Sequence, residues 1–173
     1  MSHAWLITGG SGFVGKALLA RLAASEPRRA TLRVLVRQPS DAPTHSESCV
    51  GDLRDPHSLA RACEGIDTVI HLAGIAHVGS AASAEARAVN LDGSLALLRA
   101  AIEAGARRFV FLSSTLSLDD SLHYGRDKRR VEEALLAAAA AGSIEVVILR
   151  AVNIYGPGMR GNIATMIRLI SSG

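Results

Sequence analysis

Near its N-terminus the chain reads Thr8-Gly9-Gly10-Ser11-Gly12-Phe13-Val14-Gly15, between an apolar run and a helical pattern. The spacing Gly9-x-x-Gly12-x-x-Gly15 permits a tight turn, close approach of the backbone to a pyrophosphate, and close packing of helix on strand. A helix that begins here points its free N–H groups at the phosphates. The strand–loop–helix context therefore favours a dinucleotide site over a purely structural glycine turn, with cofactor contacts from Gly9, Gly12, Phe13, Val14 and Gly15.

Outward from this loop, short apolar runs alternate with longer helical patterns. We expect strands at Ala4–Thr8, Leu32–Val36, Ser48–Val50, Thr68–Leu72, Phe109–Ser113 and Glu145–Leu149. We expect helices at Val14–Ala24, His57–Cys63, Ala82–Ala104 and Tyr124–Ala141. Continuous Val, Ile and Leu runs are typical of strands buried on both faces. The alternation predicts an α/β fold, a Rossmann-like doubly wound parallel sheet of about six strands with right-handed crossovers.

The length of 173 residues suits one domain with one core, so we assign residues 1–173 to a single dinucleotide-binding domain. With 49% apolar and only 3% aromatic residues, the core must consist of Leu, Val, Ile and Ala. Pro39–Ser48 is expected to form a long polar loop, and Asn162–Ser172 a last helix. We expect no separate substrate domain after it.

A net charge of +3 raises the question of nucleic-acid binding. However, the basic residues are scattered doublets without interleaved aromatic residues, which indicates solvated faces. These doublets are Arg28-Arg29, Arg107-Arg108 and Arg129-Arg130. The charge is compatible with an anionic small-molecule substrate, and we expect no nucleic-acid partner.

Cys49 and Cys63 lack metal-ligand spacing and form no Cys-x-x-Cys pair, so we expect thiols in a reducing compartment and no metal site. No signal peptide opens the chain, and no apolar run reaches the length that spans a membrane. The expectation is a cytoplasmic protein without a membrane partner.

The ends of the second and third strands bear on the choice of cofactor. An acidic residue after the second strand would favour NAD, but this chain has Arg37, whose guanidinium can pair with a 2′-phosphate. Arg37 thus favours NADP, while NAD stays open because Arg37 can equally be a solvated loop residue. After the third strand, Asp52 can accept from the adenine amino group and Leu53 can cover the ring.

The fourth strand ends in His71-Leu72-Ala73-Gly74. Ala73 and Gly74 are small, so the backbone of Leu72, Ala73 and Gly74 is suited to line a cofactor site. His71 is interpreted as a packed strand-end residue rather than a catalyst. His77 lies where a substrate would come close, but the polarity of a loop explains it equally well.

Several segments resemble, in order, the successive motifs of extended short-chain dehydrogenases/reductases, with closest likeness to nucleotide-sugar epimerases, dehydratases and 4-keto-reductases. The resemblance spans essentially the whole chain but only about the N-terminal half of such an enzyme. Besides the glycine loop, its segments are Gly51-Asp52-Leu53, His71-Leu72-Ala73-Gly74, Asn90-Leu91-Asp92-Gly93, Ser113-Ser114-Thr115, Tyr124-Gly125-Arg126-Asp127-Lys128 and the stretch from Arg150 to Gly158.

Tyr124 and Lys128 have the i, i+4 spacing that places two residues on one helix face. A nearby ammonium stabilises a phenolate, so we expect Lys128 to lower the pKa of Tyr124. Tyr124 could then exchange a proton with a substrate hydroxyl while hydride moves to or from nicotinamide, and Lys128 could bind the nicotinamide ribose. The alternative is an exposed pair without a function.

Ser114, at the end of the fifth strand, could orient the same substrate oxygen, with Thr115 as its rival. The resemblance implies that Asn90 binds cofactor or braces the site; the alternative is a solvent-facing helix residue. It also places the loop Asn153–Pro157 beside the nicotinamide, although Ala151 stands where the family often has proline.

Two departures from the family pattern concern the substrate. The interval from Ser114 to Tyr124 is only ten residues, shorter than is usual in the family. The half that holds the nucleotide-sugar in the family has no counterpart here, which also predicts an exposed apolar edge and a possible homodimer.

Three functions therefore remain in competition. The first is an NAD(P)-dependent epimerase, dehydratase or reductase that acts on a nucleotide-sugar by Tyr-assisted hydride transfer. The second is a non-catalytic dinucleotide-binding module, such as a redox sensor or the remnant of a longer enzyme. The third is ketone reduction on a smaller lipophilic substrate, against which the scarcity of aromatic residues argues weakly.

Overall fold

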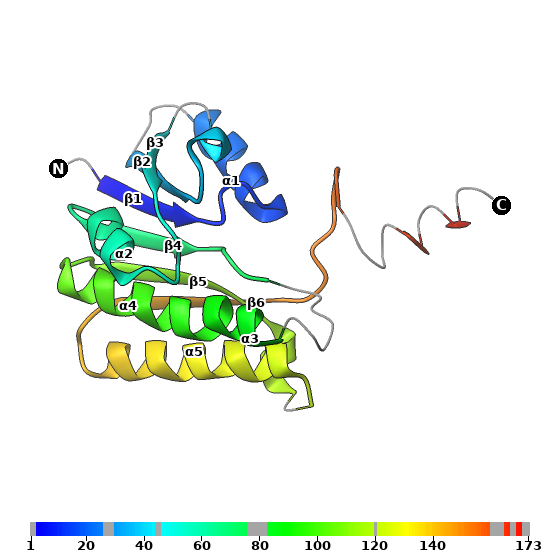
Figure 1. The fold of residues 1–173 in the computed structure, drawn as a ribbon. Helices are drawn as coiled ribbons and strands as arrows, with labels where there is room; N and C mark the ends of the chain where they lie inside the picture. The colour runs from blue at the N-terminus through cyan, green and yellow to red at the C-terminus, as the bar shows by residue number, and fades with distance from the viewer. Residues whose placement is uncertain are drawn as a thin grey trace.

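Six parallel strands form one sheet in the order β3-β2-β1-β4-β5-β6 (Figure 1). The computed structural model describes residues 3–25, 30–43, 46–75, 83–119, 121–159, 165–166 and 169–170. The strands are β1 (His3–Thr8), β2 (Ala30–Val36), β3 (Glu47–Val50), β4 (Thr68–His71), β5 (Arg108–Ser114) and β6 (Glu145–Ala151). The order reverses between β1 and β4, where open α/β sheets bind their ligands. The predicted fold class is confirmed.

Helices cover both faces of this sheet, as a doubly wound fold requires. The helices are α1 (Phe13–Ala23), α2 (Pro56–Cys63), α3 (Ser83–Arg87), α4 (Ser94–Glu103) and α5 (His123–Ala140), with short turns η1 (Pro39–Asp41), η3 (Ala88–Gly93) and η4 (Thr115–Leu118). Figure 1 shows α2, α4 and α5 together on one side of the strands and α1 on the other. The predicted polar loop after β2 contains η1, and β3 begins within its last residues.

Neighbouring strand residues separate into two apolar cores because successive side chains point to opposite faces. Leu6 and Val69 belong to the larger core under α2, α4 and α5, whereas Ile7 packs with Leu19 of α1 in the smaller one. On β6, which forms one edge of the sheet, Val147 and Leu149 are 40% and 50% exposed. The predicted exposed apolar edge is therefore at β6; a homodimer stays a prediction.

The single helix expected over Ala82–Ala104 is instead two helices joined by the π-helical turn η3. Gly93 in this turn packs so closely on Leu53 that a Cβ would lie 2.8 Å from the Leu53 Cβ. The wider turn brings Asn90 inward, where it is 1% exposed, and such π-bulges are frequent at functional sites. Arg28-Arg29, His77 and most of the expected helix Asn162–Ser172 lie outside the described residues.

A buried carboxylate ties α5 to the last two strands. Glu132, only 2% exposed, accepts hydrogen bonds from the Ser113 hydroxyl on β5 and from Arg150 on β6, whose Nη2 lies 2.7 Å from Glu132 Oε2. Burial opposes the ionisation of Glu132, but the hydrogen bonds from Arg150 and Ser113 outweigh it and hold its pKa below the usual value. The carboxylate thus stabilises the position of β6, which borders the site described below.

We predict that Glu132→Gln lowers the free energy of unfolding at pH 7 by about 2 kcal/mol, because charge-assisted hydrogen bonds are replaced by weaker ones. Since the folded-state pKa of Glu132 lies below its unfolded value, the stabilisation is present above the unfolded pKa and is lost as pH falls through the folded one. The difference between wild type and variant, measured by urea unfolding, should therefore shrink on acidification.

Glu133→Gln is the matched control, since Glu133 is the exposed neighbour on the same helix. It should change the stability little at any pH. A Glu132→Gln protein as stable as the wild type would contradict the assigned role of this network.

Candidate functional site

A cleft of about 290 Å³ opens where β1, β4, β5 and β6 end. It brings together many of the predicted site residues: Gly9, Gly12, Phe13, Val14, Gly15, Leu72, Gly74, Ser114, Tyr124 and Lys128. These come from segments far apart in the sequence, which meet because the carboxyl ends of parallel strands share one edge of the sheet.

The glycine loop forms one wall of the cleft and leaves no room for side chains. A Cβ on Gly15 would lie 2.1 Å from the Gly9 carbonyl oxygen, and one on Gly9 would lie 2.6 Å from the Ala73 nitrogen. Gly9 also has φ +74°, a conformation that favours glycine. The Gly12 N–H donates to the Gly9 carbonyl at 3.0 Å, and α1 begins at the next residue. A bare backbone followed by a helix N-terminus fits a pyrophosphate.

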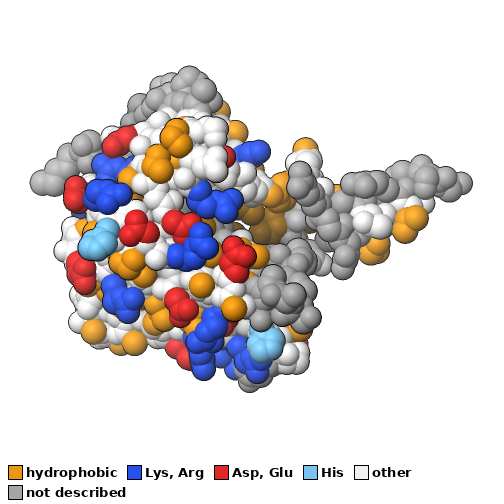
Figure 2. All heavy atoms as spheres, viewed as in Figure 1, with side chains coloured by type: hydrophobic (Ala, Val, Ile, Leu, Met, Phe, Trp, Pro, Cys, Tyr) orange, Lys and Arg blue, Asp and Glu red, His pale blue; other side chains and the backbone are white. Residues whose placement is uncertain are grey.

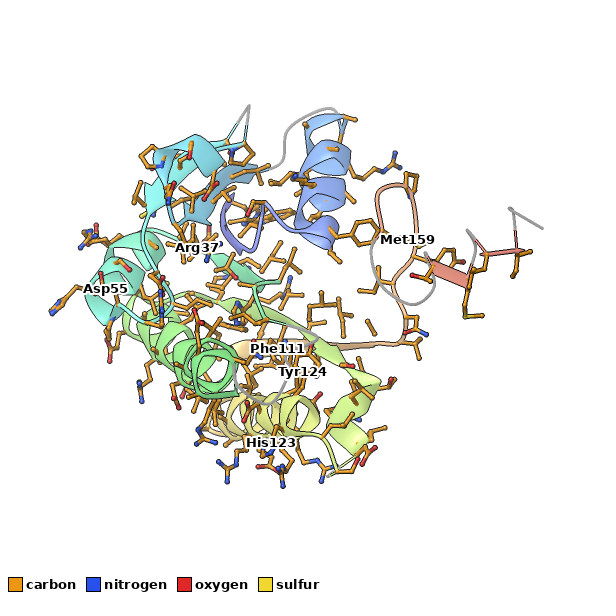
Figure 3. All side chains as sticks on the ribbon, turned by 45° about the vertical axis from the view of Figure 1, so that its right-hand side comes forward. Arg37, Asp55, Phe111, His123, Tyr124 and Met159 are labelled. Atoms are coloured by element: carbon orange, nitrogen blue, oxygen red, sulfur yellow. The ribbon has the colours of Figure 1, made fainter. Side chains whose placement is uncertain are left out.

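Tyr124 and Lys128 lie on the opposite wall, on the first turns of α5. Lys128 is 3% exposed, and its Nζ donates to the Leu112 carbonyl at 2.9 Å. The same Nζ lies 4.4 Å from the centroid of the Phe111 ring and 5.8 Å from that of Tyr124. Figure 3 shows Tyr124 next to Phe111, while its neighbour His123 points away to the outer side of the helix. The predicted helical pairing of Tyr124 with Lys128 is thus present and faces the cleft.

The expectation that the pKa of Tyr124 is lowered is wrong. Burial raises the pKa of Tyr124, and burial lowers the pKa of Lys128 to about 8 against an opposing effect of Glu132. The sequence does not show how deeply the phenol is buried or that the ammonium is engaged by Leu112. Tyr124 is therefore a neutral phenol at pH 7, and Lys128 is still mostly a cation.

Ser114 ends β5 and starts η4, where its Oγ accepts from the Leu116 N–H at 3.2 Å. The short connection to α5 closes because η4 packs directly on the helix: a Cβ on Gly125 would lie 2.1 Å from the Leu116 carbonyl oxygen. Ser114 lines the cleft, whereas its rival Thr115 is not among the lining residues. The ten-residue interval is thus long enough to bring Ser114 and Tyr124 to the same cleft.

The remaining predicted cofactor residues lie outside the cleft lining. Asp52 is held by Arg54, whose Nε and Nη2 each donate at 2.8 Å, and these hydrogen bonds lower the pKa of Asp52 to about 2. The charge of Arg37 contributes to this shift, and Val36, which precedes Arg37, pairs with Val50, two residues before Asp52. Figure 3 shows Arg37 far from Tyr124, by the end of β2. Leu53 is buried in the larger core.

Asn90 does not face solvent. Its side chain accepts from the Ile75 N–H at 2.8 Å and donates to the Ile75 carbonyl at 2.9 Å. Ala73, two residues before Ile75, packs against the glycine loop and donates to Thr8. The bracing role thus has contacts in the structure, and a direct contact of Asn90 with cofactor stays a prediction.

Sequence reasoning missed part of the cleft. Leu112, Ser113, Ala151 and Val152 also line it, together with Ile154, which belongs to the loop Asn153–Pro157 that the resemblance placed beside the nicotinamide. The strand alternation could have found Leu112, because Phe111 is buried in the larger core and Leu112 must face the other side. Strand alternation gives no such signal for Val152, which follows the end of β6.

The sequence pattern of the NAD dependent epimerase/dehydratase family matches residues 5–173. The chain belongs to this family. It is 31% identical over 193 aligned residues to UDP-glucose 4-epimerase of Vibrio cholerae, covering 100% of this chain and 58% of that protein. It is 38% identical to ceramide reductase of Caulobacter vibrioides, covering 88% and 46% respectively. The chain spans about half the length of the curated relatives it matches.

Solved structures of family members show the same fold. A short-chain dehydrogenase/reductase superfamily protein from Agrobacterium tumefaciens, with bound NAD, superposes with a TM-score of 0.76 at 34% identity and covers 86% of this chain and 48% of that one. Thermus thermophilus UDP-glucose 4-epimerase in complex with NAD gives 0.79 at 25% identity, covering 97% and 61%. The resemblance to short-chain dehydrogenases/reductases is confirmed.

Two further observations concern partners and metals. Lys and Arg side chains are interspersed with Asp and Glu on the face shown in Figure 2, rather than gathered in one patch. In the part of the chain that the structure describes, no helix has the length and apolar character to cross a membrane, and no three His, Cys, Asp or Glu side chains cluster as metal ligands would.

We predict that Lys128→Met raises the free energy of unfolding at pH 7 by about 1–3 kcal/mol, because it removes a buried charge. The folded-state pKa of about 8 lies below the usual lysine value of 10.5. The destabilisation is therefore fully present below pH 8 and is lost progressively toward pH 10.5. Urea unfolding at pH 7 and pH 10 should show the advantage of the variant shrinking.

The other lysine provides the control. Lys16 is exposed on α1, and Lys16→Met should leave the pH dependence of stability unchanged. A Lys128→Met protein less stable than the wild type at pH 7 is the outcome that contradicts this account.

Proposed function

We propose that this family member binds NAD(P) along the glycine loop and uses Tyr124 for proton transfer during hydride transfer to or from a nucleotide-linked sugar. The single observation that carries the proposal is that Ser114, Tyr124 and Lys128 line the same cleft as Gly9, Gly12 and Gly15. Relatives that match most of the chain include a UDP-glucose 4-epimerase. A protein solved in complex with UDP-glucose and NAD shares the fold of this chain.

In the reducing direction, a new C–H bond forms at the carbonyl carbon of the substrate as the C=O double bond becomes a single bond. The oxygen takes the proton of Tyr124, which is a neutral phenol in this cleft because burial raises its pKa. The resulting phenolate would share a helix face with the Lys128 ammonium, whose Nζ lies 5.8 Å from the centroid of the Tyr124 ring. We expect Ser114, which lines the same cleft, to donate to the same oxygen, and a bound dinucleotide would supply the hydride.

The cofactor preference that we propose is NADP, with NAD as the alternative. Arg37 is exposed after β2, and the neighbouring Asp52 is engaged by Arg54 rather than free. An exposed guanidinium beside a carboxylate that Arg54 already pairs with suits a 2′-phosphate. NAD is supported by the solved family members that carry it.

A second substrate class is favoured by one observation. The connection between Ser114 and Tyr124 exposes Leu116, Leu118 and Leu122, which are 40%, 63% and 45% exposed. Apolar residues next to a catalytic pair suit a lipophilic ketone, and a ceramide reductase is among the relatives. Turnover with a lipophilic ketone but with no sugar nucleotide would favour this class.

We predict that the wild-type chain binds NADP⁺ more tightly than NAD⁺, and that Arg37→Ala weakens NADP⁺ binding by about 10–100-fold because a charge-assisted contact is lost. The affinity of the Arg37→Ala variant for NAD⁺ should equal that of the wild type. Calorimetric titration measures both, and Arg99→Ala, an exposed arginine on α4, is the control. An equal loss of affinity for both dinucleotides would show that Arg37 does not select NADP, and would favour NAD as the cofactor.

We predict that Tyr124→Phe lowers turnover by about 10²–10⁴-fold while dinucleotide affinity is retained, since only the transferred proton is lost. His123→Asn, at the exposed neighbouring position on the outer side of α5, is the control. Reduced-cofactor oxidation is followed with sugar nucleotides and with lipophilic ketones. Unchanged turnover by Tyr124→Phe would exclude the mechanism, and binding without any turnover by the wild type would favour the non-catalytic module.

A further inference from the structure

A continuous chain of hydrogen bonds runs through the protein interior beneath the cleft. The Ala73 N–H lies 3.3 Å from Thr8 Oγ1, and Thr8 Oγ1 lies 2.6 Å from Nδ1 of His71. On the other side of the ring, Nε2 lies 2.8 Å from Ser94 Oγ, which lies 2.7 Å from the Asn90 carbonyl oxygen. Thr8, His71 and Ser94 are each at most 1% exposed, so water does not compete for these bonds.

The groups at the two ends of this series of hydrogen bonds determine which partner donates and which accepts in each one. The Asn90 carbonyl can only accept, so Ser94 donates its one hydroxyl hydrogen there and must accept from Nε2 of His71. The Ala73 N–H can only donate, so Thr8 accepts from it and is free to donate its own hydrogen to Nδ1. A neutral His71 with its proton on Nε2 satisfies every partner.

The surroundings of His71 favour the neutral ring. Phe111 stacks on it with ring centroids 5.6 Å apart, and Phe109 meets it edge-on at 6.0 Å. Burial lowers the pKa of His71 to about 3, with a further contribution from the Lys128 cation on α5. Thr8 on β1, Ser94 on α4 and the two Phe rings on β5 carry no charge that would favour an imidazolium.

The Thr8 end of this chain reaches the floor of the cleft. Thr8 directly precedes Gly9, whose backbone packs so closely on Ala73 that a Cβ would lie 2.6 Å from the Ala73 nitrogen. The Thr8 hydroxyl therefore bridges the glycine loop and the Ala73 segment at their point of contact. Gly74, the next residue, lines the cleft.

We propose that His71 is a positioning residue: held as the neutral Nε2–H tautomer, it orients the Thr8 hydroxyl and thereby locks the glycine loop against Ala73. The tautomer and the lock stand on the hydrogen bonds alone. Their consequence, tighter dinucleotide binding, rests on the function proposed above. The Ser94 end secures the ring in the core and does not touch the glycine loop.

The tautomer is tested without any cofactor by nitrogen-15 NMR of the imidazole rings. The chain has six histidines, and His71 is assigned as the signal missing from the His71→Asn spectrum. We expect one ring fixed as Nε2–H that does not titrate between roughly pH 5 and 8, where ordinary histidines do. An Nδ1–H tautomer, or titration near the ordinary pKa, overturns the proposal.

The contact between the glycine loop and Ala73 is tested by two variants, each of which keeps the hydrogen bond on one side of the His71 ring. His71→Asn can place its amide oxygen near Nδ1 and accept from Thr8, whereas His71→Gln can place its amide nitrogen near Nε2 and donate to Ser94. Both remove the ring and one hydrogen bond, so a merely structural role predicts equal effects. We expect faster hydrogen exchange at the Ala73 amide in His71→Gln than in His71→Asn.

Dinucleotide affinity provides the second comparison. It should fall about 5–10-fold in His71→Gln, as expected for one hydrogen bond, and about twofold or less in His71→Asn. Thr8→Val, which removes only the hydroxyl, should match His71→Gln and covers the case that a His71 variant fails to fold. Equal exchange and equal affinity in all variants overturn the lock. If the wild type binds no dinucleotide, the exchange and NMR results still decide the proposal, while the proposed function fails.

Discussion

The packing of bare backbone on bare backbone at the glycine loop is the constraint on which the cleft depends. Gly9 lies against Ala73, and Gly15 lies against the Gly9 carbonyl, at distances that exclude a Cβ in both places. These contacts hold the N-terminus of α1 at the end of β1, where a phosphate can reach its free N–H groups. The sheet order, with its reversal between β1 and β4, then places the start of α5 on the opposite side of the cleft.

Two buried polar side chains beneath this cleft, Glu132 and His71, are satisfied by specific partners. Glu132 is held by Ser113 and Arg150, and His71 lies between Thr8 and Ser94. Lys128 differs, because it remains a buried cation with one carbonyl and two aromatic rings around it. Such a charge costs stability, and lysines whose pKa is strongly lowered by burial are enriched at functional sites.

The sheet and the helix that carries Tyr124 and Lys128 could be predicted from the sequence because they are local patterns. Strands buried on both faces appear as continuous apolar runs, and Tyr124 and Lys128 share a face through their spacing alone. The π-helical turn at Asn90 could not be predicted, since it depends on the packing of Gly93 against Leu53. The raised pKa of Tyr124 was missed for a similar reason: burial is a property of the fold and not of the pair.

The central claim is that the glycine loop and the start of α5 form one dinucleotide site. Backbone amide NMR of the chain titrated with NADP⁺ and with NAD⁺ tests it most directly, because glycines mark both the site and distant turns. We predict shifts at Gly9, Gly12, Gly15 and Gly74, and none at Gly65, Gly105 and Gly142, which have no neighbouring atoms within 4 Å of a would-be Cβ. Shifts confined to those distant turns, or no shifts with either dinucleotide, would contradict the account.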